Sequence, residues 1–179
     1  MENISAWFFK VTNIRLIIGM CLIYLAFPLY LLPSIIDTGS VGPLDLLFWY
    51  NHETLYQMLS SYGQEIRHRY IVGLLSADFS YPIFYGTLLA MLLALIIKKL
   101  TISVPNNVIF FPYVVVLLDL TENVHLVFLL KSYPVRYTFI ADMAGFVTAA
   151  KWCGFVIITI MICYLIISGI RTRRNPPSN

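Results

Sequence analysis

Residues 107–131 have the sequence NVIFFPYVVVLLDLTENVHLVFLLK, an apolar run that ends at Lys131. A helix needs roughly 20 apolar residues to cross the hydrocarbon core of a bilayer. Residues 107–130 are long enough to do so, although Asp119 and Glu122 interrupt the run. Charged side chains at the centre of a membrane helix cost about 2.5–3.5 kcal/mol each, so they indicate partners or a function. The stretch therefore predicts a transmembrane helix that carries a polar site.

The composition of the whole chain supports a membrane location. Of its 179 residues, 59% are hydrophobic and 12% are charged, whereas soluble domains carry about 25% charged residues. This polar surface is too small to cover a water-soluble globule, so we expect the apolar excess to contact the lipid bilayer. The formal charge is +3, and no basic face with interleaved aromatic residues suggests nucleic acid. Three cysteines lie in apolar runs without metal-ligand spacing, and we expect them to be packing residues: Cys21, Cys153 and Cys163.

Three further segments are long and apolar enough to span the bilayer, at residues 16–36, 70–97 and 143–170. The first has the charged flank of a signal peptide, but its apolar stretch is longer than usual and no A-x-A-like cleavage site follows. We therefore expect it to be a retained anchor. The sequence predicts an all-α polytopic membrane protein, a single domain with four transmembrane helices in a bundle.

Basic residues near the span ends set the expected orientation. Seven of them lie on the side that would carry both termini: Lys10, Arg15, Lys98, Lys99, Arg171, Arg173 and Arg174. Four lie on the opposite side: Arg67, Arg69, Lys131 and Arg136. Because cytoplasmic loops carry the excess of Lys and Arg, we expect both termini in the cytoplasm. Size and topology suit a bacterial inner membrane.

Two segments outside the spans have a recognisable character. Apolar residues on one helical face of residues 43–62, with interfacial aromatics, predict an amphipathic helix on the outer membrane surface, acting as a packed cap over the bundle or as a lid over a site. Of these two, the cap is the preferred interpretation. The polar, proline-containing tail at 171–179 is typical of a disordered cytoplasmic end.

Ionisable residues of three predicted helices fall at one depth. Asp78, Glu122 and Lys151 each lie nine residues from a charged residue at the outer end of their span. At 1.5 Å per residue, each is about 13 Å below that marker. We therefore expect these groups to meet in the outer half of the bilayer.

Helical spacing adds neighbours to these charges. On the third helix Asp119, Glu122 and His125 stand at i, i+3 and i+6, and we expect them on one face with an asparagine beside them. The same spacing groups acidic and tyrosine residues on the second helix. The predicted polar pocket consists of Asp78, Tyr81, Tyr85, Asp119, Glu122, Asn123, His125 and Lys151. Prolines recur beside aromatic residues in the spans, where they bend helices, free carbonyl groups and can open a cavity: Pro28, Pro82 and Pro112.

The charges of this pocket do not balance, because three acids face one lysine. Protonation of an acid, a bound cation, an imidazolium at His125 or a basic substrate must compensate. The spacing Glu122-x-x-His125 occurs in helical-bundle metal sites, but here it occurs once and not in the paired form, so we predict no metal site and can name no cofactor. Two alternatives stay open. The third span could cross at residues 100–118, or Lys151 could pair with an acid only to hold helices together.

Short motifs carry a resemblance. L-D-L-T-E-N at 118–123, T-x-x-K-W at 148–152 and A-D-F-S-Y-P at 77–82 resemble a family of small four-helix bacterial membrane proteins with no assigned activity. The resemblance implies the architecture alone. The layout of four spans with a long first outer segment is also similar to the EXPERA group, the relatives of sterol isomerase and the sigma-2 receptor. Those proteins hold lipophilic amines or sterols in an acidic pocket, and the likeness is one of architecture.

Three functions fit these observations, in the following order. The first is a pocket that binds or acts on a small lipophilic or amphiphilic molecule, with a basic amphiphile fitting the acids best. The second is a structural or assembly subunit, in which the buried charges pair with a partner helix or a second copy of the chain. The third is a component of a proton- or cation-coupled transporter. The sequence does not decide whether the protein is an enzyme.

Overall fold

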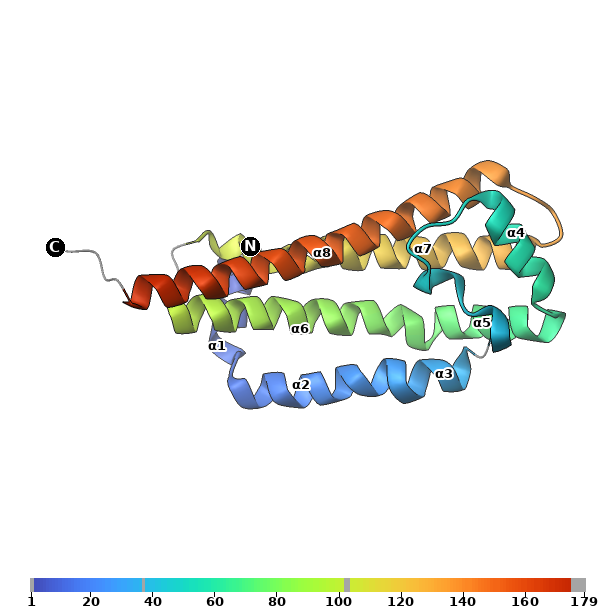
Figure 1. The fold of residues 1–179 in the computed structure, drawn as a ribbon. Coiled ribbons are helices and arrows are strands. Elements are labelled where there is room, and N and C mark those ends of the chain that lie inside the picture. Colours follow the sequence, from blue (N-terminus) through green and yellow to red (C-terminus); the bar gives the residue numbers. More distant parts are fainter. Residues whose placement is uncertain (1, 37, 102–103, 175–179) are drawn as a thin grey trace.

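The structure, a computed structural model, describes residues 2–36, 38–101 and 104–174 and is all-α in these ranges (Figure 1). The elements in chain order are α1 Glu2–Val11, α2 Ile14–Ala26, the π-helical turn η1 Phe27–Leu31, α3 Leu32–Ile35, the 3₁₀ turns η2 Gly39–Val41 and η3 Leu44–Leu46, α4 His52–Ser61, α5 Gln64–Leu75, α6 Ala77–Leu100, the 3₁₀ turn η4 Asn106–Phe110, α7 Pro112–Ser132 and α8 Thr138–Arg174.

Four helical segments of the described chain are long and apolar enough to cross a membrane, as the sequence predicts. They are Ile14–Ile35, Gln64–Leu100, Asn106–Ser132 and Thr138–Thr172. Helix α6 lies between the first span and the pair formed by α7 and α8, while α1 and the end of α8 lie at the end of the bundle opposite α4 (Figure 1). The described ends of the chain are therefore on one side, as an even number of spans requires.

The first span packs beside α6 through aromatic rings. Tyr24 and Phe27 stack on Tyr81 with ring centroids 5.6 and 5.1 Å away, and Phe27 also stacks on Phe84 at 5.9 Å. Pro28 lies in the π-helical turn, where its missing N–H and its ring disturb the regular helical hydrogen bonds. Most other side chains of the span are exposed in the chain and would contact lipid.

The second span consists of two helices rather than one. Ser76, with φ −114° and ψ −91°, breaks the helical conformation between α5 and α6. Pro82, the sixth residue of α6, has no N–H to donate to the carbonyl of Asp78 four residues earlier, as the sequence led us to expect for prolines in the spans. That carbonyl accepts a hydrogen bond from Asn123 Nδ2 on α7 instead, at 3.1 Å. The irregular backbone therefore connects α6 to α7 where the polar residues lie.

Helix α6 ends at Leu100, and Thr101 after it adopts a left-handed conformation with φ 55° before the third span begins. Helical structure resumes at Asn106, and α7 starts with Pro112 in its first turn, a position that tolerates proline. A helical span over residues 100–118 is therefore wrong, and Asp119 and Glu122 lie inside α7.

The amphipathic helix expected at 43–62 is helical only in its second half. Helix α4 covers His52–Ser61 and begins at Asn51, whose side chain accepts a hydrogen bond from the Thr54 amide at 2.9 Å. Residues 44–50, which we call the roof segment, form a 3₁₀ turn followed by extended chain at Leu47. Their backbone groups bond to side chains of the bundle, and this tertiary bonding outweighs the local helical pattern. Together, the roof segment and α4 form the expected cap, with buried residues at Leu44, Tyr50, Leu55, Tyr56, Leu59 and Tyr62.

Two helical ends differ from the sequence prediction. Helix α1 was not expected, and it precedes the first span with Trp7 53% exposed and Phe8 buried against α6 and η4. The tail expected to be disordered from residue 171 is helical to Arg174, where α8 ends, and residues 175–179 lie outside the described part of the chain.

Candidate functional site

Lys151 on α8 is the centre of a buried charged cluster. The residue is 5% exposed, and its ammonium group forms an ion pair with Glu122 Oε2 on α7. The same nitrogen lies 3.4 Å from Asp119 Oδ1 and donates to the backbone carbonyl of Asp45 at 3.3 Å. One lysine therefore joins α7, α8 and the roof segment, and the prediction that Glu122 and Lys151 meet is confirmed, whereas Asp78 takes no part in the ion pairs.

Hydroxyl groups complete the coordination of the two α7 acids. The Tyr85 hydroxyl of α6 donates to Asp119 Oδ2 at 2.8 Å. Glu122 is fully buried, and its Oε1 accepts a hydrogen bond of 2.5 Å from Thr148 Oγ1 on α8. Both carboxylates thus have polar partners at each oxygen, which offsets part of the cost of removing them from water.

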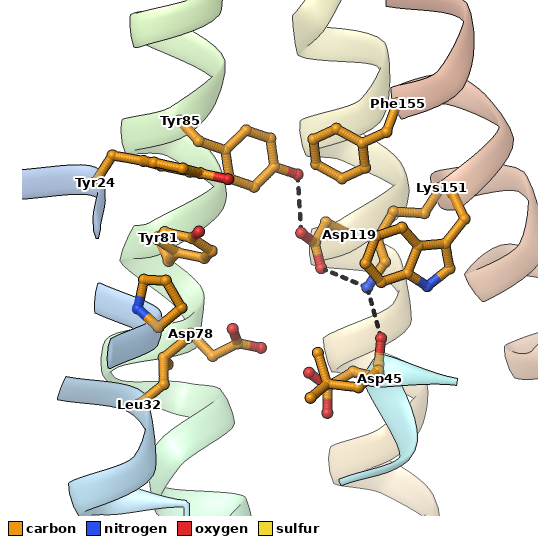
Figure 2. Close-up of a pocket in the computed structure, with 12 residues that line it drawn as sticks. Tyr24, Leu32, Asp45, Asp78, Tyr81, Tyr85, Asp119, Lys151 and Phe155 are labelled. Carbon is orange, nitrogen blue, oxygen red and sulfur yellow. Dashed lines mark hydrogen bonds and ion pairs between the residues drawn. The ribbon is translucent and has the colours of Figure 1, made fainter. Parts of the chain in front are cut away.

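Asp78 differs from the other acids in its surroundings. It is 5% exposed, and its Oδ2 atom has no hydrogen-bond partner among the described residues. Figure 2 shows its carboxylate pointing from α6 into a cavity, toward the side on which Asp119 and Lys151 lie. A buried polar atom without a partner is uncommon in native structures and calls for an explanation.

The cavity in front of Asp78 has a volume of about 370 Å³, within the usual range for small-molecule pockets. Its polar wall holds Asp45, Asp78, Asp119 and Lys151. The remaining walls are apolar or aromatic: Tyr24, Pro28, Leu32, Leu46, Tyr81, Tyr85, Trp152 and Phe155. The tyrosines and Phe155 gather on one side of the acids, and Asp45 on the roof segment lies on the other (Figure 2). A polar patch therefore faces an apolar space.

The roof segment is held over the cavity by side chains of two helices, α5 and α8. Trp152 Nε1 donates to the Leu47 carbonyl at 2.9 Å, in addition to the bond from Lys151 to Asp45. The Tyr70 hydroxyl accepts from the Leu44 amide at 2.9 Å and donates to the Asp45 carboxylate. At the far end, α8 carries Gly145, where a Cβ atom would lie 1.8 Å from the Tyr50 carbonyl oxygen. The roof is thus fixed by specific bonds and close packing.

The structure brings most of the predicted site residues together. Those that line the cavity are Asp78, Tyr81, Tyr85, Asp119 and Lys151. Glu122 and Asn123 lie behind this wall. Glu122 pairs with Lys151, and Asn123 donates a hydrogen bond to the Asp78 carbonyl. His125 lies elsewhere, with its Nδ1 atom 2.7 Å from the Thr121 carbonyl of its own helix. Six residues correspond to about 600° of helical rotation, which turns His125 roughly 120° away from Asp119.

Some lining residues were not predicted from the sequence. Tyr24, Trp152 and Phe155 look like ordinary aromatic residues of membrane helices, and only the packing of α2 and α8 around α6 brings them to the cavity. Asp45 lies near the start of the amphipathic helix expected at 43–62, yet its carbonyl and carboxylate both bond to side chains of the bundle. The sequence offers one weak indication of the aromatic lining residues: they lie within a few positions of Pro28 or Lys151.

Other polar groups in the described chain do not join this site. No group of three or more His, Cys, Asp or Glu side chains in the described ranges could hold a metal ion. His52 and Asp142 pair at the edge of the cap, with Nδ1 and Oδ1 2.9 Å apart. The expectation that the cysteines are packing residues is wrong, since all three side chains are exposed on the helices: Cys21, Cys153 and Cys163.

Comparisons with protein-family models, curated proteins and solved structures found no match to this chain. The fold and the cluster define the class of the protein. It is a helical membrane protein in which buried acidic residues are paired to Lys151.

Proposed function

We propose that the protein binds a small amphiphilic molecule in the cavity beside Asp78, with a cationic group of that molecule against the carboxylates. The observation that carries this proposal is the Asp78 carboxylate, which lines the cavity and whose buried Oδ2 atom has no hydrogen-bond partner in the described chain. A cation in the cavity beside this carboxylate would offset its charge.

The charge distribution favours a cation over an anion. Asp119 and Glu122 share Lys151, so one positive charge already stands against two negative ones before Asp78 is counted. An incoming ammonium group would meet Asp78 on α6 and the Asp45 carboxylate on the roof, whereas an anion would be repelled by both. Burial in a low-dielectric site makes this discrimination stronger than it would be in water.

The walls support an apolar body for the ligand. Aromatic rings from three helices face the cavity, including Tyr24, Tyr81 and Phe155, and such surfaces bind apolar groups and the faces of organic cations. The stretch of α6 from Leu88 to Ile97 is packed with buried aliphatic residues, which favours a closed pocket over a polar path through the membrane. Because Lys151 pairs with Asp119 and Glu122 within the chain, neither acid needs a partner helix to supply its ion pair.

We further propose that both termini lie in the cytoplasm. Helix α1 and the ends of α6 and α8 lie at the end of the bundle opposite α4 (Figure 1), and they carry the basic residues Lys10, Lys98 and Arg171. A bacterial inner membrane is the location that best suits this arrangement. Reporter fusions to the two termini, of the kind that are active only on one side of a membrane, test the orientation.

Binding of matched probes tests the function. In lipid nanodiscs, 4-phenylbutylamine should bind the wild-type chain at least tenfold more tightly than 4-phenylbutan-1-ol, which has a similar shape and no charge. Asp78→Asn should abolish that preference, because the amide has no charge for the ammonium group. Glu65→Gln, which removes a carboxylate 76% exposed at the capped end, is the matched control and should leave it unchanged. Equal binding of amine and alcohol to the wild-type chain would contradict the proposal.

A further inference from the structure

The cavity has a second arm. A space of about 240 Å³ is lined by Pro33, Ile36 and Pro43, and it shares five lining residues with the larger cavity: Pro28, Leu32, Asp45, Leu46 and Asp78. We call this space the side arm. The shared residues include both Asp45 and Asp78, so the acids lie where the two spaces meet. The side arm itself is lined almost wholly by proline, leucine and isoleucine.

The rim of the side arm is apolar and exposed. Leu46 is 65% exposed, and Pro28 and Pro33 are also exposed. Pro28, Leu32 and Pro33 belong to the segment Ile14–Ile35, which is one of the four membrane spans. An opening bordered by these residues faces the acyl chains of the bilayer rather than water. At its far end, Ile36 packs against the bare backbone of Gly73 on α5, with an aliphatic carbon 2.1 Å from the position a Cβ would take.

The opposite route, through the roof, is obstructed. Lys151 and Trp152 bond to roof carbonyls, Tyr70 bonds to Leu44 and Asp45, and Tyr62 donates to the Gly42 carbonyl at 2.6 Å. A molecule arriving from water would have to break several of these bonds. A molecule arriving from the membrane would pass only between apolar side chains of the first span and Leu46.

We infer that the ligand is a single-chain cationic amphiphile taken laterally from the bilayer, whose tail occupies the side arm while its head meets Asp78. This inference rests on the proposed function and adds to it the source of the ligand and the place of its tail. A long unbranched tail fits a narrow arm between one helix and a loop, and the position of the acids at the junction lets the head remain in the larger cavity. The membrane then serves as the reservoir, and solubility in water is not required.

Photo-crosslinking from the tail tests this inference. The probe is a twelve-carbon primary alkylamine with a diazirine near the end of its chain, in nanodiscs of phosphatidylcholine. We expect mass spectrometry to map the label to residues 32–36 and to Pro43. Tryptophan at either of two lining positions, Leu32→Trp or Leu46→Trp, fills the arm and should reduce this labelling at least fivefold. The matched control is Leu29→Trp, at a leucine 63% exposed on the first span and outside both cavities, and it should retain wild-type labelling.

Two outcomes separate the inference from the proposed function. Labelling of the wild-type chain that is spread over the exposed surfaces of all four spans would overturn the inference even if Asp78→Asn still abolished preference for the short amine. Labelling confined to the side arm but insensitive to Asp78→Asn, and displaced equally by dodecylamine and dodecanol, would overturn the cationic head while locating the tail. The wild-type map alone decides the first case, so the test does not depend on either tryptophan variant folding.

Discussion

Removal of the lysine at the centre of the cluster should destabilise the fold strongly. In Lys151→Met the fully buried Glu122 loses its ion pair, Asp119 loses a cation 3.4 Å away, and the Asp45 carbonyl loses a donor. Breaking a buried ion pair by removing one partner costs about 3–5 kcal/mol, since the other charge stays buried. For a chain of this length a loss of 1 kcal/mol lowers the melting temperature by about 2–4 °C, so the expected drop is about 6–20 °C.

The assay is thermal unfolding in detergent, followed by intrinsic fluorescence, for four proteins. The double variant Lys151→Met/Glu122→Gln should recover more than half of the loss, because it no longer buries an unpaired carboxylate and an amide can still bond to Thr148. Lys131→Met is the control, since this exposed lysine at the end of α7 should contribute within about 0.5 kcal/mol. A Lys151→Met protein with the melting temperature of the wild type would refute the account of the cluster, as would a double variant less stable than the single one.

Further predictions concern the cap formed by the roof segment and α4. Gly145→Ala puts a Cβ atom 1.8 Å from the Tyr50 carbonyl oxygen and should cost about 1–3 kcal/mol in unfolding measurements, whereas Gly19→Ala, with nothing within 4 Å, should be neutral or slightly stabilising. Burial raises the pKa of the Tyr50 and Tyr62 phenols above the ordinary value of 10.0 because desolvation disfavours the phenolate. Their contribution to stability is present below that value and should be lost as the pH rises above it, since the unfolded chain releases these protons first. The melting temperature should therefore fall less steeply with rising pH for Tyr50→Phe/Tyr62→Phe than for the wild type. Equal slopes for the two proteins would contradict this.

The four spans and the meeting of Glu122 and Lys151 could be predicted because they depend on local signals. Span length follows from the run of apolar residues, and depth follows from the fixed rise of a helix. The freed Asp78 carbonyl follows from the chemistry of Pro82, although its partner Asn123 could not be deduced from the spacing. The face of a helix is also local, and His125 was misplaced because i+6 does not return to the face of Asp119.

The roof and the aromatic wall could not be predicted because they depend on contacts between distant segments. Residues 44–50 carry an amphipathic pattern, yet tyrosine, lysine and tryptophan side chains on α5 and α8 bond to their backbone and keep it from forming a helix. Nothing in the sequence around Tyr24 or Phe155 indicates that the two rings line one cavity. Such positions become evident only when the helices are packed.

The most direct test of the central claim is native mass spectrometry of the protein extracted gently from its own membranes. If the cavity binds a cationic amphiphile at Asp78, the wild-type chain should carry an additional mass that, once released, ionises as a basic lipophilic molecule. Asp78→Asn should lose this mass, while Glu65→Gln should keep it. An additional mass that is acidic or uncharged, or one retained equally by Asp78→Asn, would contradict the claim.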